Sequence, residues 1–411
     1  MAFRCARRTL ICHHVTMSTN QPPLTGIKVV DMSTMISGPL TAMMLADYGA
    51  DVIKIESPGQ GDLMRYLGTQ KNGLTGLFHL NNRGKRSINL NVKSKEGLEV
   101  LTKLIAEADV FVQNYRPGAL ERLGLGYEDV KKFNPGIIYV SISGYGPDGP
   151  NSHRRVYDNV IQAASGVASV QADPATGKPQ MLRNLACDKV TSYTAMQSIC
   201  AALFARERGT AEGQHIVVAM LDAAVAFLWP DAGMDATVLD DDAMRMPTLG
   251  ANYNVTVLED GYCASSAVSD VEFKGLWAAL GRPDLADDPR FSTAVARSQN
   301  TPELVKTMKE LSSKTKVADF LRVAEEHDLP ASAVNSIADL PNDPQIKNNQ
   351  IFVERTHPVM GKVREVRPAA RMSETGLRVS SPAPMRGEHT DDIVREIGLD
   401  PVALREAGAI F

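Results

Sequence analysis

Residues 27–56 read IKVVDMSTMISGPLTAMMLADYGADVIKIE, and this stretch decides the fold. Residues 27–31, IKVVD, predict a buried strand, and residues 40–48 have helical character. Gly49 ends the helix, and residues 50–56 predict a second buried strand. A strand–helix–strand unit of this kind predicts two parallel strands joined by a right-handed crossover.

The same alternation continues along the chain. Further strands are predicted at residues 87–90, 109–113, 136–142 and 215–219. Further helices are predicted at residues 95–108, 119–133, 189–208 and 221–228. Alternating strands and helices predict an α/β fold with a Rossmann-like, doubly wound, mostly parallel sheet. Ligands of such sheets bind at the carboxyl ends of the strands.

The length of 411 residues favours more than one domain. Residues 24–230 are expected to form the N-terminal part of a large domain, and residues 231–250 a polar linker. Residues 251–335 have the pattern of a smaller α+β domain. Residues 336–411 are expected to hold a linker and a C-terminal part that returns to the large domain.

Residues 1–23 are expected to be a disordered N-terminal extension. Residues 1–16 contain three arginines and no acidic residue, which fits a transit peptide. The alternative is that translation starts at Met17, and this alternative favours a cytoplasmic protein.

Composition restricts the class of protein. The chain is 44% hydrophobic and 22% charged with a net charge of −4, which is typical of a soluble protein and not of a nucleic-acid binder. No apolar run reaches the roughly 18–20 residues that span a bilayer, so no membrane partner is expected. The five cysteines are scattered without a CxxC pair, so we expect neither disulfides nor a metal site.

Asp188 stands directly before the predicted helix 189–208. Aspartate is among the best helix N-caps, and spacing alone favours that structural role. The same position also allows a nucleophile, because the helix dipole and free amides stabilise a carboxylate there. The neighbouring Cys187 is another formal nucleophile, but a cysteine in an apolar segment is more often part of the core.

Two further patterns suggest an anionic ligand. Residues 144–149, GYGPDG, match GxGxxG after a strand, but Pro147 and the polar run 151–155 favour a loop near an active site over a nicotinamide site. Basic residues recur near predicted strand ends, a distribution that fits a ligand with several phosphates. They are Arg83, Lys85, Arg86, Arg116, Arg122, Arg154 and Arg155.

Several segments together resemble the class III CoA-transferases. They are residues 24–31 (LTGIKVVD), 37–39 (SGP), 49–56 (GADVIKIE), 82–87 (NRGKRS), 113–118 (QNYRPG), 143–146 (SGYG) and 386–390 (RGEHT). The resemblance covers roughly residues 24–400 and implies an interlocked homodimer of chains with a large and a small domain. It also implies coenzyme A as a co-substrate, small carboxylic acids as substrates and no permanently bound cofactor.

The resemblance assigns roles to individual residues. Asp188 matches the nucleophile that carries a covalent aspartyl intermediate. The expected coenzyme A contacts are Asn114 and Tyr115 near the nucleotide, Lys85, Arg86, Arg122 and Arg155 near the phosphates, and Met35, Ile36 and Ser37 near the thioester. Asp158 could assist Asp188, or it could be a surface loop acid.

The α-methylacyl-CoA racemases share this fold and remain an alternative. They use a histidine about 31 residues before the aspartate, and Tyr157 occupies that place here. A tyrosine with an ordinary pKa near 10 is a poor base at neutral pH, which favours the transferase. An acyl-CoA hydrolase and a non-catalytic CoA-binding protein are further alternatives. The GGGG run of formyl-CoA transferase is absent, and Ser57 replaces an arginine common after the second strand, so the acid substrates stay open.

Overall fold

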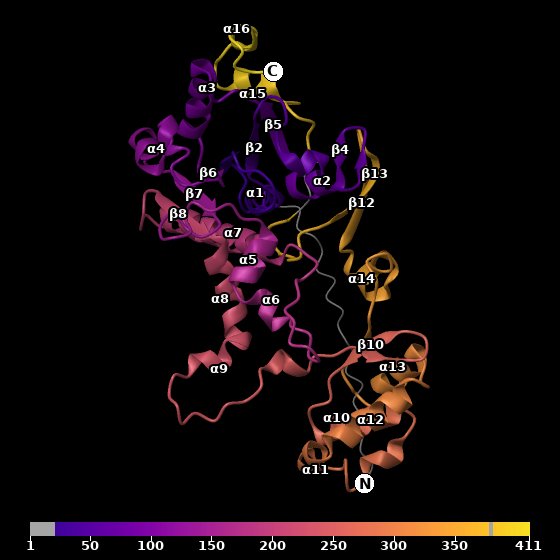
Figure 1. Cartoon of the computed structure of the whole chain (residues 1–411). Coiled ribbons are helices and arrows are strands. Elements are labelled where there is room, and N and C mark those ends of the chain that lie inside the picture. Colours follow the sequence, from indigo (N-terminus) through magenta and orange to yellow (C-terminus); the bar gives the residue numbers. More distant parts are fainter. Residues whose placement is uncertain (1–20, 378–380) are drawn as a thin grey trace, which may run out of the picture. The chain divides into compact units, whose positions relative to one another are not determined.

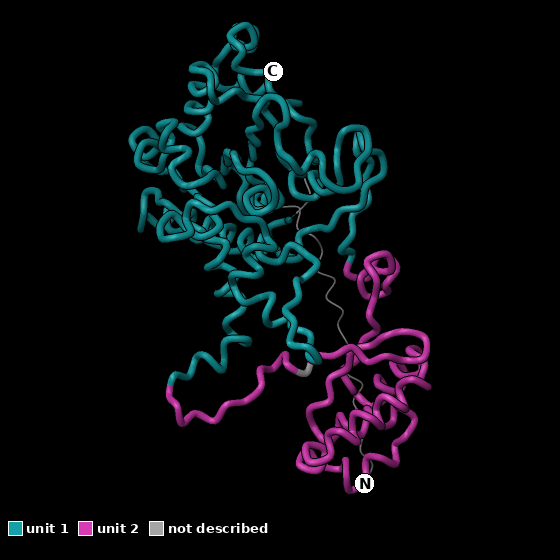
Figure 2. The backbone as a smooth tube through the Cα atoms, in the orientation of Figure 1, with its two compact units in different colours: residues 1–239, 350–411 teal, residues 240–349 magenta. Residues whose placement is uncertain are grey.

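The computed structural model describes residues 21–377 and 381–411 (Figure 1). Residues 1–20, which include most of the expected N-terminal extension and Met17, lie outside the described residues. The chain divides into two compact units (Figure 2). Among the described residues, unit 1 holds 21–239 and 350–411, and unit 2 holds 240–349.

Unit 1 is built on a six-stranded parallel sheet, which confirms the predicted α/β fold with a parallel sheet. In chain order the strands are β1 (Lys28–Asp31), β2 (Asp51–Glu56), β5 (Lys85–Asn89), β6 (Val110–Gln113), β7 (Ile138–Ser143) and β8 (Gln214–Ala219). Their order across the sheet is β5-β2-β1-β6-β7-β8. This is the strand order of dinucleotide-binding folds, with the switch in winding direction between β1 and β6.

Helices cover both faces of the sheet, because successive strand residues point to opposite sides. Val29 of β1 packs into one apolar cluster and Val30 into the other. The Val29 side is covered by α1 (Ser37–Asp47), α7 (Ala186–Glu207) and α8 (Met220–Ala232). The Val30 side is covered by α3 (Lys95–Ala106), α4 (Tyr127–Phe133) and α15 (Thr390–Glu396). The sheet is therefore a buried middle layer, and its strand ends are where a ligand can approach.

Shorter elements complete unit 1. They are the hairpin β3 (Gln70–Lys71) and β4 (Leu74–Thr75), followed by α2 (Gly76–Asn82), α5 (Asp158–Ala164), α6 (Val167–Val170), α9 (Met234–Thr237) and α16 (Pro401–Glu406). An antiparallel hairpin of β12 (Phe352–His357) and β13 (Gly361–Val366) was not predicted from the sequence. Its alternating polar and apolar residues are a strand pattern that the many charged residues obscure.

Unit 2 combines a small antiparallel sheet with helices. The strands are β9 (Thr256–Val257), β10 (Tyr262–Ser265) and β11 (Ala331–Ala333). The helices are α10 (Asp270–Ala279), α11 (Ala294–Gln299), α12 (Thr301–Ser312), α13 (Val317–Glu326) and α14 (Pro344–Asn349). Trp277, Phe291 and Phe320 are buried at its centre, so unit 2 has a hydrophobic core of its own.

One predicted boundary is wrong in a way that matters for the site. Helix α7 begins at Ala186, with Leu185 at the N-cap position, and not after Asp188. Asp188 therefore lies in the first turn of the helix and does not cap it. Among the described residues, no helix is long and apolar enough to cross a membrane.

Candidate active site

The first turns of two helices meet at Asp188. Ser37 is the first residue of α1, and its hydroxyl donates a hydrogen bond to Oδ1 of Asp188 in α7. The hydroxyl of Ser192 contacts the backbone oxygens of both Ser37, at 2.8 Å, and Asp188, at 2.9 Å. These contacts hold the two helix starts together, so the Asp188 carboxylate lies next to the positive end of the α1 dipole.

Asp158 contacts the backbone of Asp188. It is the first residue of α5 and only 3% exposed, so the interpretation as a surface loop acid is wrong. Its Oδ2 accepts a hydrogen bond from the backbone N–H of Asp188 at 2.9 Å, and its Oδ1 accepts one from Gln162. Asp158 thus satisfies a free amide at the start of α7 and places a second negative charge beside Asp188.

The surroundings of Asp188 raise its pKa from 3.8 to about 6. Burial of the carboxyl group is the largest cause; the Ser37 hydroxyl opposes it by hydrogen bonding, and the charge of Asp158 adds to the rise. At neutral pH the group is mainly ionised but more basic than an ordinary aspartate. A partly desolvated, basic carboxylate is suited to nucleophilic attack.

A cavity of about 380 Å³ opens beside Asp188 at the carboxyl ends of β1, β6 and β7, as expected for this sheet. It is lined by Thr34, Met35, Ser37, Leu63, Asn114, Tyr115, Arg116, Pro117, Ile142, Ser143, Gly144, Ser152, Arg154, Arg155, Val156, Tyr157, Asp188 and Met220. Asp188 is the sole carboxylate in this lining. The cavity therefore presents one acidic group to a ligand.

Three arginines give the cavity its charge. Arg116, Arg154 and Arg155 are exposed and line it, and none of them forms an ion pair within the described chain. Guanidinium groups without an acidic partner bind phosphates and carboxylates well through their forked donors. Arg116 and Arg154 belong to basic groups visible in the sequence, but the resemblance assigned them no role.

The cavity brings together most of the residues that the sequence singled out. Met35, Ser37, Asn114, Tyr115, Arg155, Tyr157 and Asp188 all line it. Ile36 does not, because its side chain is buried in an apolar cluster with Met64 and Phe78. Asn114 lines the cavity, yet its amide is bonded to the backbone of Thr34, accepting from its N–H at 2.9 Å and donating to its oxygen at 2.7 Å.

Lys85, Arg86 and Arg122 are not part of the cavity lining. Lys85 is fully buried, and its ammonium donates to Asp31, Pro39 and Asn82. Arg86 points to the other face of β5 and forms ion pairs with Asp51 at 2.7 Å and with Glu396 at 2.8 Å. The phosphate contacts expected of Lys85 and Arg86 are therefore not supported by their positions, since both cations are already neutralised.

Two other sequence-based alternatives are resolved by the geometry. Cys187 is 1% exposed, and burial with the nearby Asp158 charge raises the pKa of its thiol to about 12, which disfavours a thiolate nucleophile. The segment after Gly144 continues as a loop until α5 begins at Asp158, so the GxGxxG run opens no helix. A Cβ on Gly144 would lie 2.4 Å from Val156, which explains a glycine there.

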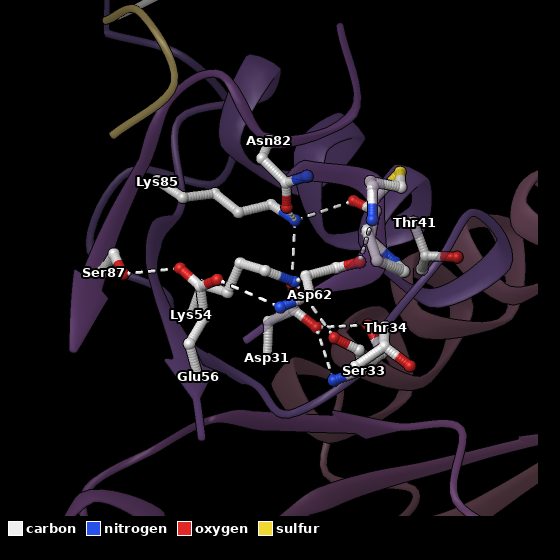
Figure 3. A network of polar contacts seen from close by, with 12 residues as sticks. Asp31, Ser33, Thr34, Thr41, Lys54, Glu56, Asp62, Asn82, Lys85 and Ser87 are labelled. Carbon is white, nitrogen blue, oxygen red and sulfur yellow. Dashed lines mark hydrogen bonds and ion pairs between the residues drawn. The ribbon is translucent and has the colours of Figure 1, made fainter. Parts of the chain in front are cut away.

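The buried charges beneath the site were not predicted from the sequence. Asp31, Lys54 and Asp62 form a network with Lys85, and their side chains are fully buried or nearly so (Figure 3). One signal was available: Lys54 stands between Ile53 and Ile55 in a predicted buried strand, and a buried lysine needs an acidic partner. Nothing in the sequence showed which acid that would be.

Comparisons with known proteins agree with the geometry. Residues 24–390 match the model of CoA-transferase family III. The chain is 35% identical to the succinyl-CoA:glutarate CoA-transferase of Mus musculus, covering 91% of this chain and 86% of the relative. It is 33% identical to the succinate–glutarate CoA-transferase of Agrobacterium fabrum, over 93% and 97% of the two chains.

A solved structure extends the likeness to three dimensions. A CAIB/BAIF family protein from Brucella suis superimposes with a TM-score of 0.82 at 34% identity, covering 92% of this chain and 100% of the other. The family match spans nearly the whole chain, and it includes both helices that meet at Asp188. The chain therefore belongs to CoA-transferase family III.

Proposed function

We propose that this protein moves coenzyme A from an acyl-CoA donor to a free carboxylic acid through a covalent intermediate on Asp188. The observation that carries the proposal is the state of Asp188. It is the sole carboxylate lining a cavity with three arginines that form no ion pair with the described residues, and its pKa is raised to about 6. The carboxylate is thus available as a nucleophile beside groups that can hold an anionic substrate.

The first half of the reaction transfers coenzyme A to the enzyme. An oxygen of Asp188 attacks the thioester carbonyl of the donor, the carbon–sulfur bond breaks, and a mixed anhydride and the thiolate of coenzyme A form. The thiolate then attacks the aspartyl carbonyl of the anhydride. The bond between the aspartyl carbonyl carbon and the bridging oxygen breaks, which leaves an aspartyl thioester and releases the donor acid as its carboxylate.

The second half runs the same steps in reverse with another acid. The acceptor carboxylate attacks the aspartyl thioester and expels the thiolate, which forms a second anhydride. The thiolate attacks the acceptor carbonyl, and Asp188 leaves as a carboxylate. One thioester is exchanged for another, so no external energy source is needed. Backbone amides of the glycine-containing loop at residues 144–149 are candidates for the donors that stabilise each oxyanion.

Binding roles follow from the cavity lining. We assign Arg155, with Tyr115, to coenzyme A, and Met35 and Ser37 to the neighbourhood of the thioester, since all four line the cavity. Asp158 assists by fixing the backbone of Asp188 rather than by touching substrate. We assign Tyr157, which is 61% exposed on the cavity wall, no proton-transfer step.

Dicarboxylic acids are the substrate class that we propose. Two relatives similar over nearly the whole chain are named for succinyl-CoA or succinate and for glutarate. The cavity supports this class, because Arg116 and Arg154 supply cationic groups beyond the one assigned to coenzyme A. A second carboxylate on the substrate would find a partner there.

The test is a mass-spectrometric exchange assay. Purified protein is mixed with succinyl-CoA and a panel of free mono- and dicarboxylic acids, and new thioesters are identified by mass. A new acyl-CoA that forms with the parent enzyme and disappears with Asp188→Asn supports the proposal. Full transfer by the variant would overturn it. Thioester loss without an acceptor would indicate a hydrolase, and deuterium entering the α-carbon of a branched acyl-CoA would indicate a racemase.

We also propose a homodimer. Large apolar side chains are exposed on α7 and α8, including Phe204 at 67% and Phe227 at 65%. Trp229, on α8, is 47% exposed. Exposed apolar residues of this size often mark a protein interface. A sedimentation measurement that finds only monomer at assay concentration would contradict this proposal.

A further inference from the structure

We propose that four buried charged residues, Asp31, Lys54, Asp62 and Lys85, position the loop that presents Ser37 to the nucleophile. We call them the buried charge cluster (Figure 3). None of the four lines the cavity, so none is placed to touch substrate. The inference rests on the proposed function, because it concerns how Asp188 is prepared for attack.

The loop needs to be held because its backbone is strained. Met35 has a φ of 66°, which places a residue with a side chain in the left-handed region. Such a conformation is unfavourable for a residue with a side chain and persists only where surrounding contacts enforce it. Met35 lies two residues before Ser37, so any relaxation of the loop would move the hydroxyl that bonds Asp188.

Asp62 contacts the strained residue directly. Its Oδ1 accepts hydrogen bonds from the backbone N–H of Met35 at 3.2 Å and of Met64 at 3.0 Å. The other carboxylate oxygen forms an ion pair with Nζ of Lys54 at 2.9 Å, and both side chains are fully buried. One carboxylate therefore joins the loop to strand β2.

Lys54 holds the same loop at Ser33. Its ammonium donates to the backbone oxygen of Ser33 at 3.0 Å and lies 4.0 Å from Oδ2 of Asp31. Glu56, two residues further along β2, accepts from the backbone N–H of Asp62 at 3.4 Å and pairs with Arg65. Asp62 is thus fixed by its backbone and by its side chain.

Asp31 and Lys85 fix the two ends of the loop. Asp31 accepts from the backbone N–H of Ser33 at 2.9 Å and from its hydroxyl. Lys85 pairs with Asp31 at 2.7 Å and donates to the backbone oxygen of Pro39, in the first turn of α1, at 2.9 Å. The end of β1 and the start of α1 are therefore tied to one ammonium group.

Packing leaves the loop little room. A Cβ on Gly38 would lie 2.2 Å from the Cβ of Ser33, so the loop rests directly on the first turn of α1. On the cavity side, Asn114 holds Thr34 through both its N–H and its oxygen. The loop is thus clamped from the buried charge cluster on one side and from Asn114 on the other.

Stability alone is a weak reason for four buried charges. Two acids and two lysines balance, but well-packed apolar residues in place of buried ion pairs are often as stable or more so. Apolar residues could not supply what the cluster supplies here, which is donors and acceptors for the backbone of Ser33 and Met35. The contacts point to a positioning role.

The experiment compares how transfer depends on pH in variants of the cluster. Asp62→Asn keeps the side-chain shape but turns an amide towards the Lys54 ammonium, which should loosen the loop. Because Ser37 lowers the pKa of Asp188, a loosened Ser37 should move the acid limb of kcat/KM upward by about 0.5–1 pH unit. Ser37→Ala should give a shift in the same direction, and the double variant no larger shift than Ser37→Ala alone.

Asn114→Ala covers the case in which Asp62→Asn does not fold. It removes both bonds to Thr34 without touching the buried charge cluster, and it should raise the acid limb in the same way. Asp47→Asn is the matched control, because it breaks another buried ion pair, with Arg83 at 2.6 Å, at the far end of α1. It should leave the limb in place.

The outcomes separate the inference from the proposed function. Folded variants with the parent pH profile would overturn the positioning role, as would a shift from Asp62→Asn that adds to that of Ser37→Ala. An equal shift from Asp47→Asn would show that loss of a buried ion pair elsewhere on α1 has the same effect, and would also overturn the positioning role. If the parent enzyme shows no transfer that depends on Asp188, the proposed function itself fails.

Discussion

The Ser37 hydroxyl donates a hydrogen bond to the Asp188 carboxylate across a sequence separation of 151 residues. One residue starts α1 and the other lies in the first turn of α7, so the contact exists only because the two helices pack with their N-termini together. The ionisation of the proposed nucleophile is therefore controlled from a different helix.

Ser37→Ala should weaken transfer most at low pH. The hydroxyl lowers the pKa of Asp188, so its loss raises that pKa above about 6 and protonates more of the nucleophile. We expect a loss of roughly three- to tenfold in kcat/KM near pH 6 and a smaller loss near pH 8. Ser198→Ala is the matched control, because the hydroxyl of Ser198 donates within α7, to the backbone oxygen of Thr194. Equal losses at both pH values would contradict the prediction.

Asp158→Asn should move the acid limb of the pH profile of kcat/KM to lower pH, opposite to the effect of Ser37→Ala. The negative charge of Asp158 raises the pKa of Asp188, so a neutral amide lets the nucleophile ionise at lower pH. The side-chain oxygen of Asn can still accept from the backbone N–H of Asp188. We expect the limb of kcat/KM to fall by a few tenths of a pH unit to about one unit. An upward shift would show that Asp158 does not act through its charge.

Asp188→Asn should make the protein more stable at neutral pH. The folded state raises the pKa of this carboxyl from 3.8 to about 6, so folding opposes its ionisation. The cost is fully present above about pH 6 and is lost as pH falls towards 4, and it amounts to about 1–3 kcal/mol. Urea unfolding of both proteins near pH 7.5 and near pH 4.5 measures the difference.

The control for that measurement is Asp222→Asn. Asp222 is the third residue of α8, as Asp188 is of α7, but it is exposed. Its substitution should slightly lower stability, because the helix dipole favours an exposed acid in the first turn. A gain in stability from Asp222→Asn, or none from Asp188→Asn, would contradict the account.

Lys85→Met should reduce stability and leave the affinity for acyl-CoA unchanged. Burial lowers the pKa of Lys85 to about 8, opposed by Asp31, so the group is still an ammonium at neutral pH. Removing it leaves Asp31 buried with one cation fewer, at a cost of about 3–5 kcal/mol. The measurement is thermal unfolding together with the KM for acyl-CoA. A phosphate-binding lysine would show the reverse pattern, a raised KM with little loss of stability.

Arg155→Ala should raise the KM for acyl-CoA by about tenfold and change kcat little, since a phosphate contact is the same in the ground and transition states. Its effect should shrink at high salt, because Arg155 is exposed and screened. Arg322→Ala is the control, an exposed arginine of unit 2 that pairs with Glu326. Unchanged KM in Arg155→Ala would remove this residue from the coenzyme A site.

The strand–helix alternation could be predicted from the sequence because it depends on residues that are close together in the chain. Val29 and Val30 occupy opposite faces of β1 by the geometry of a strand alone, and a helical crossover between successive strands makes them parallel. The expectation of a site at the strand ends followed from the same rule, and Asp188, Met35 and Tyr115 all line the cavity found there. The hairpin 352–366 escaped prediction, because its pairing is set by the partner strand as much as by its own residues.

The sequence by itself determined the α/β sheet, the family resemblance and the candidacy of Asp188, because periodicity and motifs lie in residues close together in the chain. Only the tertiary structure decided which partner each charged residue contacts and whether its side chain is buried. Lys85 and Arg86 are adjacent, yet one is buried against Asp31 and the other faces outward to Asp51. Which cation meets which acid depends on segments far apart in sequence, and these meet only when burial of the apolar faces brings the strands and helices together.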